Sequence, residues 1–337
     1  MIAEEDLVRS PAWLPVDVAA NGVSLARLDE AAYCRSSFLD QRLFALGYER
    51  SLCSPGVIGS AATHLTFPSH YIFHTGHVGS TLISRLLGEH SAFFVLREPA
   101  MLRAIAAPAA GTVAAGAADA HGLTLEVALA LLGRTWRPGQ RALVKATSFV
   151  SELAGRALAA GAHPTAIFMF AQALAYLRGI FAGPASRAES RQLAPMRLAR
   201  LVRRIGGSDP HLVPRSEGEW IAMSWACEMS ALREAADRFA SRVLWVDFDA
   251  FLAEPAVALE AIFRTLGAQP AAGEIERLLG SPVMRQYSKA PEHAYDAALR
   301  RELLLEAGRE HAAEIGRGMQ WLERLTRRHP LLDVQPR

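Results

Sequence analysis

The segment His74-Thr75-Gly76-His77-Val78-Gly79-Ser80-Thr81 gathers the residue types that bind a phosphate-like anion. Gly76 and Gly79 permit the tight backbone conformations and close approach that an anion-binding loop needs. Ser80 and Thr81 add hydroxyl donors at the point where a helix can begin. The segment lacks the lysine of GxxxxGK[ST], so it does not predict an ATP- or GTP-hydrolysing site.

Two patterns flank this segment and place it between a strand and a helix. Tyr71-Ile72-Phe73 is a short apolar run that predicts a buried strand. Residues 80–87 have apolar side chains at helical spacing, and Gly88 can end that helix. Such a helix N-terminus offers unpaired N–H groups and the positive end of the helix dipole. The alternative, a helix capped through Ser80 that binds no ligand, stays open from the sequence.

Other polar residues follow further apolar runs. Arg97-Glu98, Lys145 and Ala171-Gln172 each come directly after a predicted strand. The carboxyl ends of parallel strands meet at one edge of a sheet, where ligands bind. We therefore expect these residues to lie near the 74–81 loop.

The elements that must position them alternate along the chain. Short apolar runs predict strands, and amphipathic patterns predict helices between them, which is typical of an α/β protein with a parallel sheet covered on both faces. The expected strands span 93–96, 142–145, 166–170 and 243–246, and the expected helices span 123–136, about 171–181, 217–239, about 255–267 and 297–327.

Two domains and two less regular stretches complete the expected organisation. Residues 1–68 are expected to form an N-terminal extension packed on the core, and 69–337 the α/β domain with a helical C-terminal part. Residues 104–119 are nearly all Ala, Gly and Pro, which predicts a loop at the mouth of the sheet, with an Ala-rich helix as the alternative. The Arg-rich stretch 187–215 is expected to be partly irregular and exposed.

Composition excludes several classes of protein. Of 337 residues, 51% are hydrophobic and 21% charged, and the net charge is only +2, so nothing favours extended disorder or a nucleic-acid partner. Three separate cysteines, Cys34, Cys53 and Cys227, do not have metal-ligand spacing, and we expect no metal. The acidic N-terminus does not resemble a signal peptide and no apolar run could cross a membrane, so we expect a cytoplasmic protein without a membrane partner.

Two of these segments together resemble the sulfotransferase family. His74–Leu82 is similar to the loop, usually P-[KR]-S-G-T-T, that the family uses for the 5′-phosphosulfate of PAPS (3′-phosphoadenosine 5′-phosphosulfate). Val246–Pro255, followed by apolar residues through Gly267, is similar to the family's late strand and helix. The resemblance covers roughly residues 70–270 and implies a three-layer sandwich of the P-loop NTPase-like, sulfotransferase type with PAPS as co-substrate.

The resemblance also implies roles for individual residues. Lys145 is similar in position to a lysine that stabilises the transferred group, although a strand-end lysine reaching solvent is about as plausible. Glu98 is at a spacing similar to that of the catalytic base in the tyrosylprotein branch, with Arg97 as a binder of donor or acceptor; the alternative is an Arg–Glu pair that fixes a loop. His77 replaces the family's usual Lys or Arg and could itself be the base. The expected donor-binding residues of the loop are Thr75, Gly76, His77, Val78, Gly79, Ser80 and Thr81.

The chain departs from the family where the 3′-phosphate of PAPS is normally held. Ala171 and Gly179 occupy the positions of the expected Arg and Ser. Arg178, one position away, or Lys289, in a late loop, could replace the missing contacts. Trp220 and Trp225 on the 217–239 helix could line an acceptor pocket, but aromatic residues on such a helix are more often core.

The resemblance implies an enzyme that transfers a sulfonate group in line from PAPS to a hydroxyl or amine of a small-molecule or peptide acceptor. One alternative is a transferase of the same fold with a different anionic donor, and another is a non-catalytic nucleotide- or anion-binding module. The long helices could pair in a homodimer or pack on the sheet.

Overall fold

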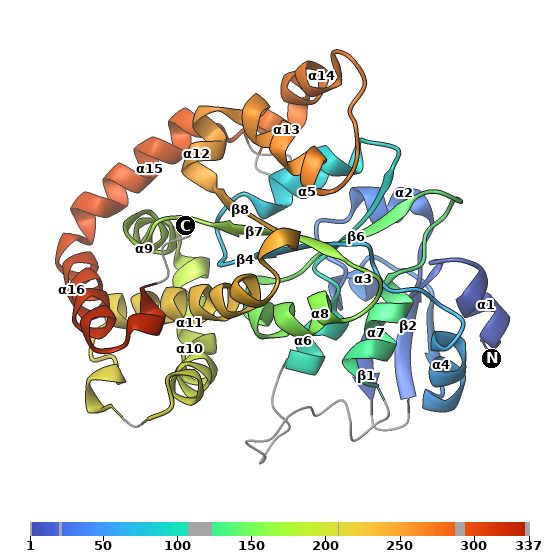
Figure 1. Ribbon diagram of the computed structural model, residues 1–337, viewed down its shortest axis with the longest axis horizontal. Coiled ribbons are helices and arrows are strands. Elements are labelled where there is room, and N and C mark those ends of the chain that lie inside the picture. The colour runs from blue at the N-terminus through green and yellow to red at the C-terminus, as the bar shows by residue number, and fades with distance from the viewer. Residues whose placement is uncertain (1, 20–21, 107–122, 208, 287–293, 334–337) are drawn as a thin grey trace.

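The computed structural model describes residues 2–19, 22–106, 123–207, 209–286 and 294–333 (Figure 1). Its centre is a five-stranded parallel sheet with the order β5-β6-β4-β7-β8. The strands are β4 His70–His74, β5 Phe93–Arg97, β6 Arg141–Lys145, β7 Thr165–Phe170 and β8 Val243–Asp247. Each expected strand is present, and the predicted α/β fold with a central parallel sheet is confirmed.

Helices cover both faces of this sheet. In β4, Tyr71 and Phe73 pack into one hydrophobic cluster while Ile72 between them packs into another, because successive side chains of a strand point to opposite faces. The Ile72 face is covered by α5 Ser80–Gly88, α12 Phe248–Ala253, α13 Pro255–Thr265 and α14 Glu274–Gly280. The Tyr71 face is covered by α6 Ala100–Ala106, α7 Leu125–Leu132, α8 Ala154–Ala159 and part of α11 Glu217–Arg238. The result is the expected three-layer sandwich.

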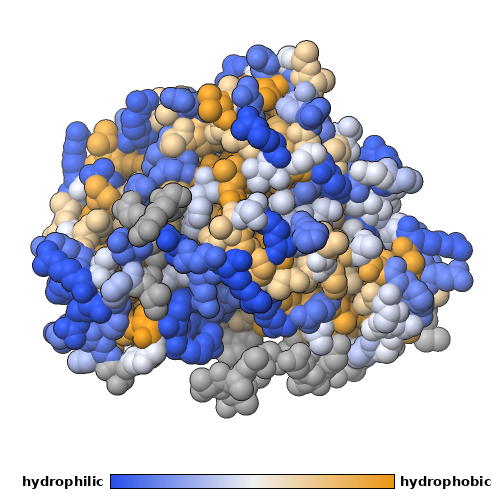
Figure 2. Space-filling view, viewed as in Figure 1, coloured by the Kyte–Doolittle hydropathy of each residue, from blue (hydrophilic) through white to orange (hydrophobic). Residues whose placement is uncertain are grey.

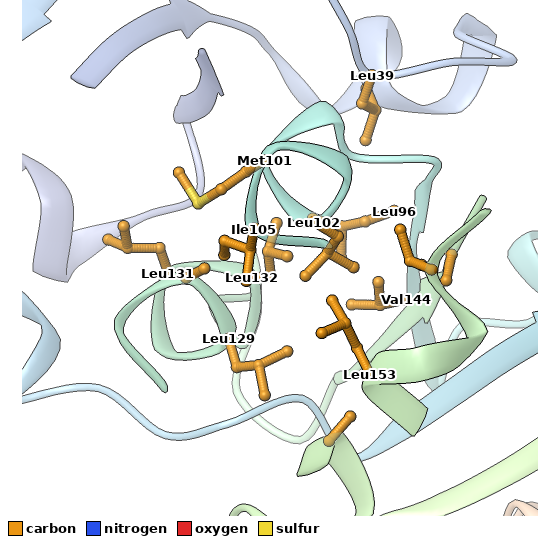
Figure 3. Close-up of a cluster of buried hydrophobic side chains, with 14 of the residues drawn as sticks. Leu39, Leu96, Met101, Leu102, Ile105, Leu129, Leu131, Leu132, Val144 and Leu153 are labelled. Atoms are coloured by element: carbon orange, nitrogen blue, oxygen red, sulfur yellow. The ribbon is translucent and has the colours of Figure 1, made fainter. Parts of the chain in front are cut away.

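The Tyr71 face has an aliphatic core that joins consecutive elements. Figure 3 shows Leu96 and Val144 of the sheet facing α6 residues Leu102 and Ile105. Leu129 and Leu132 of α7 and Leu153, from the 3₁₀ segment η2 Ser148–Leu153, close the same cluster. This packing fixes the carboxyl ends of β5 and β6, where the candidate site residues Glu98 and Lys145 lie.

The N-terminal residues form a small antiparallel sheet that the sequence analysis did not predict. Its order is β1-β2-β3. Leu14 and Leu25 from its strands belong to the same cluster as Tyr71, so this sheet packs on the central domain. The strands are β1 Trp13–Ala19, β2 Gly22–Arg27 and β3 Arg50–Cys53, and the accompanying helices are α1 Glu4–Arg9, α2 Glu30–Arg35, α3 Arg42–Ala45 and α4 Pro55–Ala62.

A helical subassembly builds the C-terminal part and corrects one expectation. The single helix expected over 297–327 is two helices that meet at His311, since α15 packs on α9 while α16 packs mainly on α11. These helices are α9 Ala173–Phe181, α10 Pro184–Ile205, α15 Ala297–Glu310 and α16 Ala312–Arg328. The remaining 3₁₀ segments are η3 Pro210–Leu212, η4 Ala240–Arg242, η5 Pro282–Arg285 and η6 Pro330–Leu332. Trp225 lies in the core of this subassembly and Trp220 packs against it.

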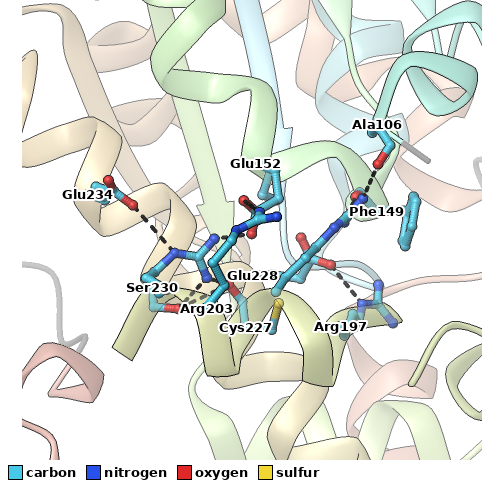
Figure 4. A network of polar contacts seen from close by, with 12 residues as sticks. Ala106, Phe149, Glu152, Arg197, Arg203, Cys227, Glu228, Ser230 and Glu234 are labelled. Carbon is cyan, nitrogen blue, oxygen red and sulfur yellow. Dashed lines mark hydrogen bonds and ion pairs between the residues drawn. The ribbon is translucent and has the colours of Figure 1, made fainter. Parts of the chain in front are cut away.

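The expectation of a partly irregular and exposed 187–215 stretch was only partly right. Residues 187–205 belong to the helix α10, and several of its arginines point inward (Figure 4), whereas the described residues of this stretch after Ile205 are irregular apart from η3. Arg197 pairs with Glu228 of α11 at 2.7 Å, and both side chains are buried. Arg200 donates to the carbonyl of Phe149 at 2.7 Å, and Arg204 pairs with Glu152. Partners on η2 and α11 therefore compensate the buried charges, which a one-dimensional pattern of arginines cannot reveal.

The visible surface is mixed in character. On the face seen in Figure 2, hydrophilic residues line the periphery and hydrophobic residues form smaller clusters between them. Among the described residues, no helix combines the length and apolar character needed to span a membrane. The predicted 104–119 loop lies almost wholly outside the described residues, apart from the end of α6.

Candidate functional site

The 74–81 loop lies at the carboxyl edge of the central sheet, as expected. β4 is the middle strand, so its end lies between Lys145 of β6 and Phe170 of β7. The backbone N–H of Thr75 donates to the carbonyl of Met169 at 3.1 Å, which extends the ladder one residue beyond β4. The loop therefore starts from a fixed backbone position.

His74 holds the loop to the neighbouring strand. Its Nε2 lies 2.9 Å from the carbonyl oxygen of Ala146, and the backbone N–H of Gly76 donates to its Nδ1 at 3.1 Å. Both contacts are satisfied by the tautomer with hydrogen on Nε2. His74 is thus a buried support of the loop that ties it to the segment after Lys145.

The backbone of the loop turns through three residues with positive φ. These are Gly76 at 99°, His77 at 56° and Gly79 at 65°. At Gly79 a Cβ would lie only 2.0 Å from the ring of Phe248, so both the conformation and the space require glycine. Gly79 is the N-cap of α5 and no side chain caps the helix. The alternative in which Ser80 caps this helix is therefore wrong.

Two hydroxyl groups of the loop are buried and have no hydrogen-bond partner among the residues that the structure describes. They are Oγ1 of Thr75 and Oγ1 of Thr81. Leaving such a group unpaired costs about 1–3 kcal/mol, so native proteins seldom do so without a reason. Ser80 is also buried, in the first turn of α5. The helix N-terminus therefore has spare donors where an anion is expected.

A pocket of about 300 Å³ opens over this helix N-terminus. The loop supplies His77, Val78 and Gly79, with Ser80 and Thr81 beside them. The opposite walls come from α9, α12, η5 and α15 and the chain around them, and include Gly179, Ser186, Phe248, Leu252, Met284, Gln286, Tyr295, Asp296, Arg300 and Leu304. The walls are mostly apolar, which suits a ligand with one anionic end and a less polar body.

Arg300 is a pocket residue that the sequence analysis missed. It is the single Lys or Arg among the described residues that line the pocket. It is buried, forms an ion pair with Asp249, and its guanidinium lies 5.0 Å from the centre of the Phe248 ring. No motif marks it, because it reaches the site only through the packing of α15 beside α12.

Lys145 and Glu98 meet at the ends of β6 and β5. They form an ion pair, with the Lys145 side chain fully buried and the Glu98 side chain 14% exposed. The backbone N–H of Glu98 also donates to the carbonyl of Lys145 at 2.7 Å, and Glu98 has a positive φ of 50°. Lys145 therefore does not reach solvent. Neither residue lines the pocket over α5, although His74 links the loop to the adjoining segment.

Arg97 points away from this pair, so the alternative Arg97–Glu98 pair does not form. Its NH1 group donates to the carbonyls of Tyr33, Cys34 and Ser36, which end α2, at 3.0–3.3 Å. Burial, and then the charge of Arg85, lowers the pKa of Arg97 to about 10, so it remains charged at neutral pH. Its expected role as a binder of donor or acceptor at the loop does not agree with this orientation.

The expected 3′-phosphate region has no cation at its family positions. Ala171 is buried and its carbonyl accepts a hydrogen bond of 2.9 Å from the indole of Trp225. Gly179 lines the pocket, whereas Arg178 does not and instead lies against Gly308 of α15. Lys289 lies outside the described residues. Among the residues that the structure does describe, no cluster of three His, Cys, Asp or Glu side chains could hold a metal ion.

Comparison with known proteins gives structural similarities only. No protein-family model and no curated protein matches the chain. A sulfotransferase domain from the curacin biosynthetic pathway aligns with a TM-score of 0.41 and 13% identity, covering 73% of this chain and 98% of its own. A sulfotransferase from Alicyclobacillus acidocaldarius aligns with a TM-score of 0.40 and 15% identity, covering 74% of this chain and 94% of its own. The chain is thus similar in arrangement to solved sulfotransferases at low sequence identity.

Proposed function

We propose that this protein is a sulfotransferase that binds the anionic end of a PAPS-type donor on the 74–81 loop. The observation that carries the proposal is the N-terminus of α5, which no side chain caps and where the buried Thr81 hydroxyl lacks a partner inside a pocket. Oriented N–H groups and hydroxyls at such a position favour a phosphate or sulfate group. The resemblance of His74–Leu82 and Val246–Pro255 to sulfotransferase segments supports the same function.

The helix N-terminus fits the anionic end of such a donor. Thr81 lines the pocket and has a hydroxyl that an oxyanion would satisfy, whereas the unpartnered hydroxyl of Thr75 does not line it. Gly79 lets the loop pack against the Phe248 ring at this point. His77 lines the pocket from the loop itself. PAPS would supply the sulfonate, and the chain would supply donors fixed in place before the reaction, which is the main requirement for stabilising charge in group transfer.

The pair of Lys145 and Glu98 would serve the transfer step. The acceptor oxygen or nitrogen forms a bond to sulfur as the bond from sulfur to the donor phosphate breaks, and the acceptor loses a proton. Glu98 is our candidate for the base that accepts this proton, with His77 as the alternative. Lys145 holds Glu98 in place through its ion pair and would supply positive charge at the strand ends.

A second candidate, a transferase of this fold with a donor lacking a 3′-phosphate, is favoured by the Ala171 and Gly179 positions. Arg300 is the single described Lys or Arg in the pocket, and Asp249 already pairs with it. A ligand with a second phosphate therefore gains less here than at a site with a free arginine.

The test is calorimetric titration with adenosine 3′,5′-bisphosphate, 5′-AMP and inorganic sulfate, without added metal. We expect micromolar binding of the bisphosphate and weaker binding of sulfate. Equal affinity for the bisphosphate and 5′-AMP would favour the second candidate. Binding of neither nucleotide would refute both forms of the proposal.

Paired glycine variants localise the binding. Gly79→Asp places a carboxylate against the anion and a Cβ in the ring of Phe248, so binding should be lost. Gly139→Asp is the matched control, because Gly139 also has a positive φ, of 79°, but has no atom within 4 Å of its Cβ position. Sulfonate transfer from PAPS to a panel of phenols and amines then tests catalysis directly.

A further inference from the structure

A second cavity lies beside β5 at the C-terminal end of α5, away from the pocket at the N-terminus of that helix. Its volume is about 300 Å³, and it lies between α2, the connection from α5 to β5, and the turn before β6. Its described lining includes Arg97, Gly88, Cys34, Gln140 and Tyr33. Along β5, Phe93 and Val95 point to the Ile72 face, and Arg97 follows the same alternation.

Arg97 has one edge of its guanidinium without a protein partner. Its NH1 group makes the three hydrogen bonds to the end of α2, while Nε is buried and has no partner. The structure gives no hydrogen bond from NH2 to any described residue. Nε and NH2 form the side-on fork that binds a carboxylate with two parallel hydrogen bonds.

The charges around the cavity leave Arg97 uncompensated. Glu30 pairs with Arg137, and Glu89 pairs with Arg277 at 3.1 Å. His90 lies 3.7 Å from Glu274. Arg97 itself has no carboxylate partner within the described chain, although the residue is only 4% exposed. Burial of an unpaired charge is costly, so a ligand that supplies one negative charge would be stabilised here.

We infer that this cavity is a binding site for a small monoanionic carboxylate, held side-on by Arg97. One uncompensated cation matches a single negative charge better than a phosphate dianion. The space beside NH2 is also narrow, since a Cβ on Gly88 would lie 3.2 Å from that nitrogen. Tyr33, Phe93 and Phe94 provide apolar walls for the body of the ligand. The site is independent of the proposed function.

Cys34 provides a local probe of this site. It lines the cavity and is exposed, whereas Cys53 and Cys227 are buried. Iodoacetate carries a carboxylate and iodoacetamide does not. Either reagent forms a carbon–sulfur bond with the thiolate as iodide leaves, and the thiol proton passes to solvent. The rates of Cys34 alkylation by the two reagents, followed by peptide mass spectrometry on the full chain, therefore report recognition of the carboxylate.

We expect the rate of Cys34 alkylation to saturate as the iodoacetate concentration rises. The ratio of the iodoacetate rate to the iodoacetamide rate should be at least tenfold higher for Cys34 than for free glutathione. Acetate should slow iodoacetate more than it slows iodoacetamide. Arg97→Lys, which keeps the charge but loses the fork, should reduce the ratio severalfold. Gly88→Ala should also reduce this rate ratio, and it keeps Arg97 and its hydrogen bonds to the end of α2. The test therefore does not depend only on a variant that loses those bonds. Arg137→Gln tests the second guanidinium that lines the cavity, and the ratio should hold there because that group is exposed and already paired with Glu30.

Three results would overturn the inference. The first is a rate ratio equal to that of glutathione. The second is an equal loss of ratio in Arg137→Gln and Gly88→Ala, which would show general electrostatic attraction. The third is stronger protection by inorganic phosphate than by acetate at equal concentration, which would assign a different class of anion.

Discussion

The α10–α11 network and the α5 N-terminus both bury polar groups, but only those of the network have protein partners. In the network, the guanidinium groups of Arg197, Arg200 and Arg204 all have partners on neighbouring elements (Figure 4). At the α5 N-terminus, the Thr81 hydroxyl is buried without a partner and no side chain caps the helix. The difference separates polar groups that complete the fold from polar groups available to a ligand.

The difference also predicts how substitutions act. Removing one member of a satisfied buried pair leaves its partner desolvated and should destabilise the fold. Removing a buried group that has no partner should not lower the free energy of unfolding and should weaken only ligand binding. The four predictions below test this distinction.

The largest effect is expected in the network. Glu228→Gln leaves Arg197 buried without its carboxylate and should lower the free energy of unfolding by about 3–5 kcal/mol. Burial alone would lower the pKa of Arg197, but the charge of Glu228 raises it overall, which marks the strength of this pairing. Urea denaturation measures the loss. The exposed pair of Arg327 and Glu323 supplies the control, since Glu323→Gln should cost less than about 0.5 kcal/mol. Similar losses in both variants would contradict the comparison.

The Lys145–Glu98 pair should respond asymmetrically. Glu98→Gln leaves the fully buried Lys145 without its carboxylate and should cost about 3 kcal/mol of stability. Lys145→Met replaces the cation with an apolar side chain of similar length, and Glu98 can still reach water, so the cost should be less than half as large. Urea denaturation of the two variants decides the order. A larger loss in Lys145→Met would mean that Lys145 mainly packs and does not depend on Glu98.

His70 has one buried ring nitrogen without a partner in the described chain, and it lies at the end of β4 opposite to the loop. Its Nδ1 contacts Thr165 at 2.8 Å, and its Nε2 has no partner. Burial, and then the charge of Arg141, lowers the pKa of His70 to about 3 in the folded protein. Between that value and about 6.5 the unfolded chain binds the additional proton, so stability falls as the pH falls through this range.

From pH 6.5 to pH 5, His70 should account for a loss of up to about 2 kcal/mol. Unfolding free energies of the wild type and His70→Asn at both pH values measure its share. A pH dependence that is the same in both proteins would show that His70 does not titrate as proposed.

The smallest effect on stability is expected at Thr81. Thr81→Val keeps the shape and removes the unpartnered hydroxyl, so the free energy of unfolding should not fall and should rise by about 1 kcal/mol. Binding of adenosine 3′,5′-bisphosphate should weaken about tenfold, because a hydrogen bond to a charged group contributes roughly 1.5–3 kcal/mol. Thr326→Val is the matched control, since its hydroxyl donates to the carbonyl of Leu322 at 2.9 Å and Thr326 does not line the pocket. The control should lose a little stability and no affinity.

The sequence alone determined the elements that depend on local pattern. Short runs of three to five mainly apolar residues identified all five strands of the central sheet, because strands buried on both faces are nearly continuously hydrophobic. Gly76 and Gly79 identified the turn between β4 and α5, because both have positive φ and the Phe248 ring leaves no room for a side chain at Gly79. The strand-end positions of Glu98 and Lys145 followed from the same pattern.

Only the tertiary structure decided what those residues and their neighbours contact. The sequence placed Glu98 and Lys145 at strand ends, but their pairing depends on β5 and β6 being neighbours in the sheet. The Arg97 guanidinium binds the end of α2 and does not line the pocket over α5. Arg300 enters that pocket from α15, a helix about 220 residues after the loop in the sequence. The inward arginines of α10 are also invisible to pattern, because a charge is tolerated inside only when a distant element supplies its partner. Local pattern fixes where a strand or turn occurs, whereas the partner of a long polar side chain depends on packing between segments far apart in the chain.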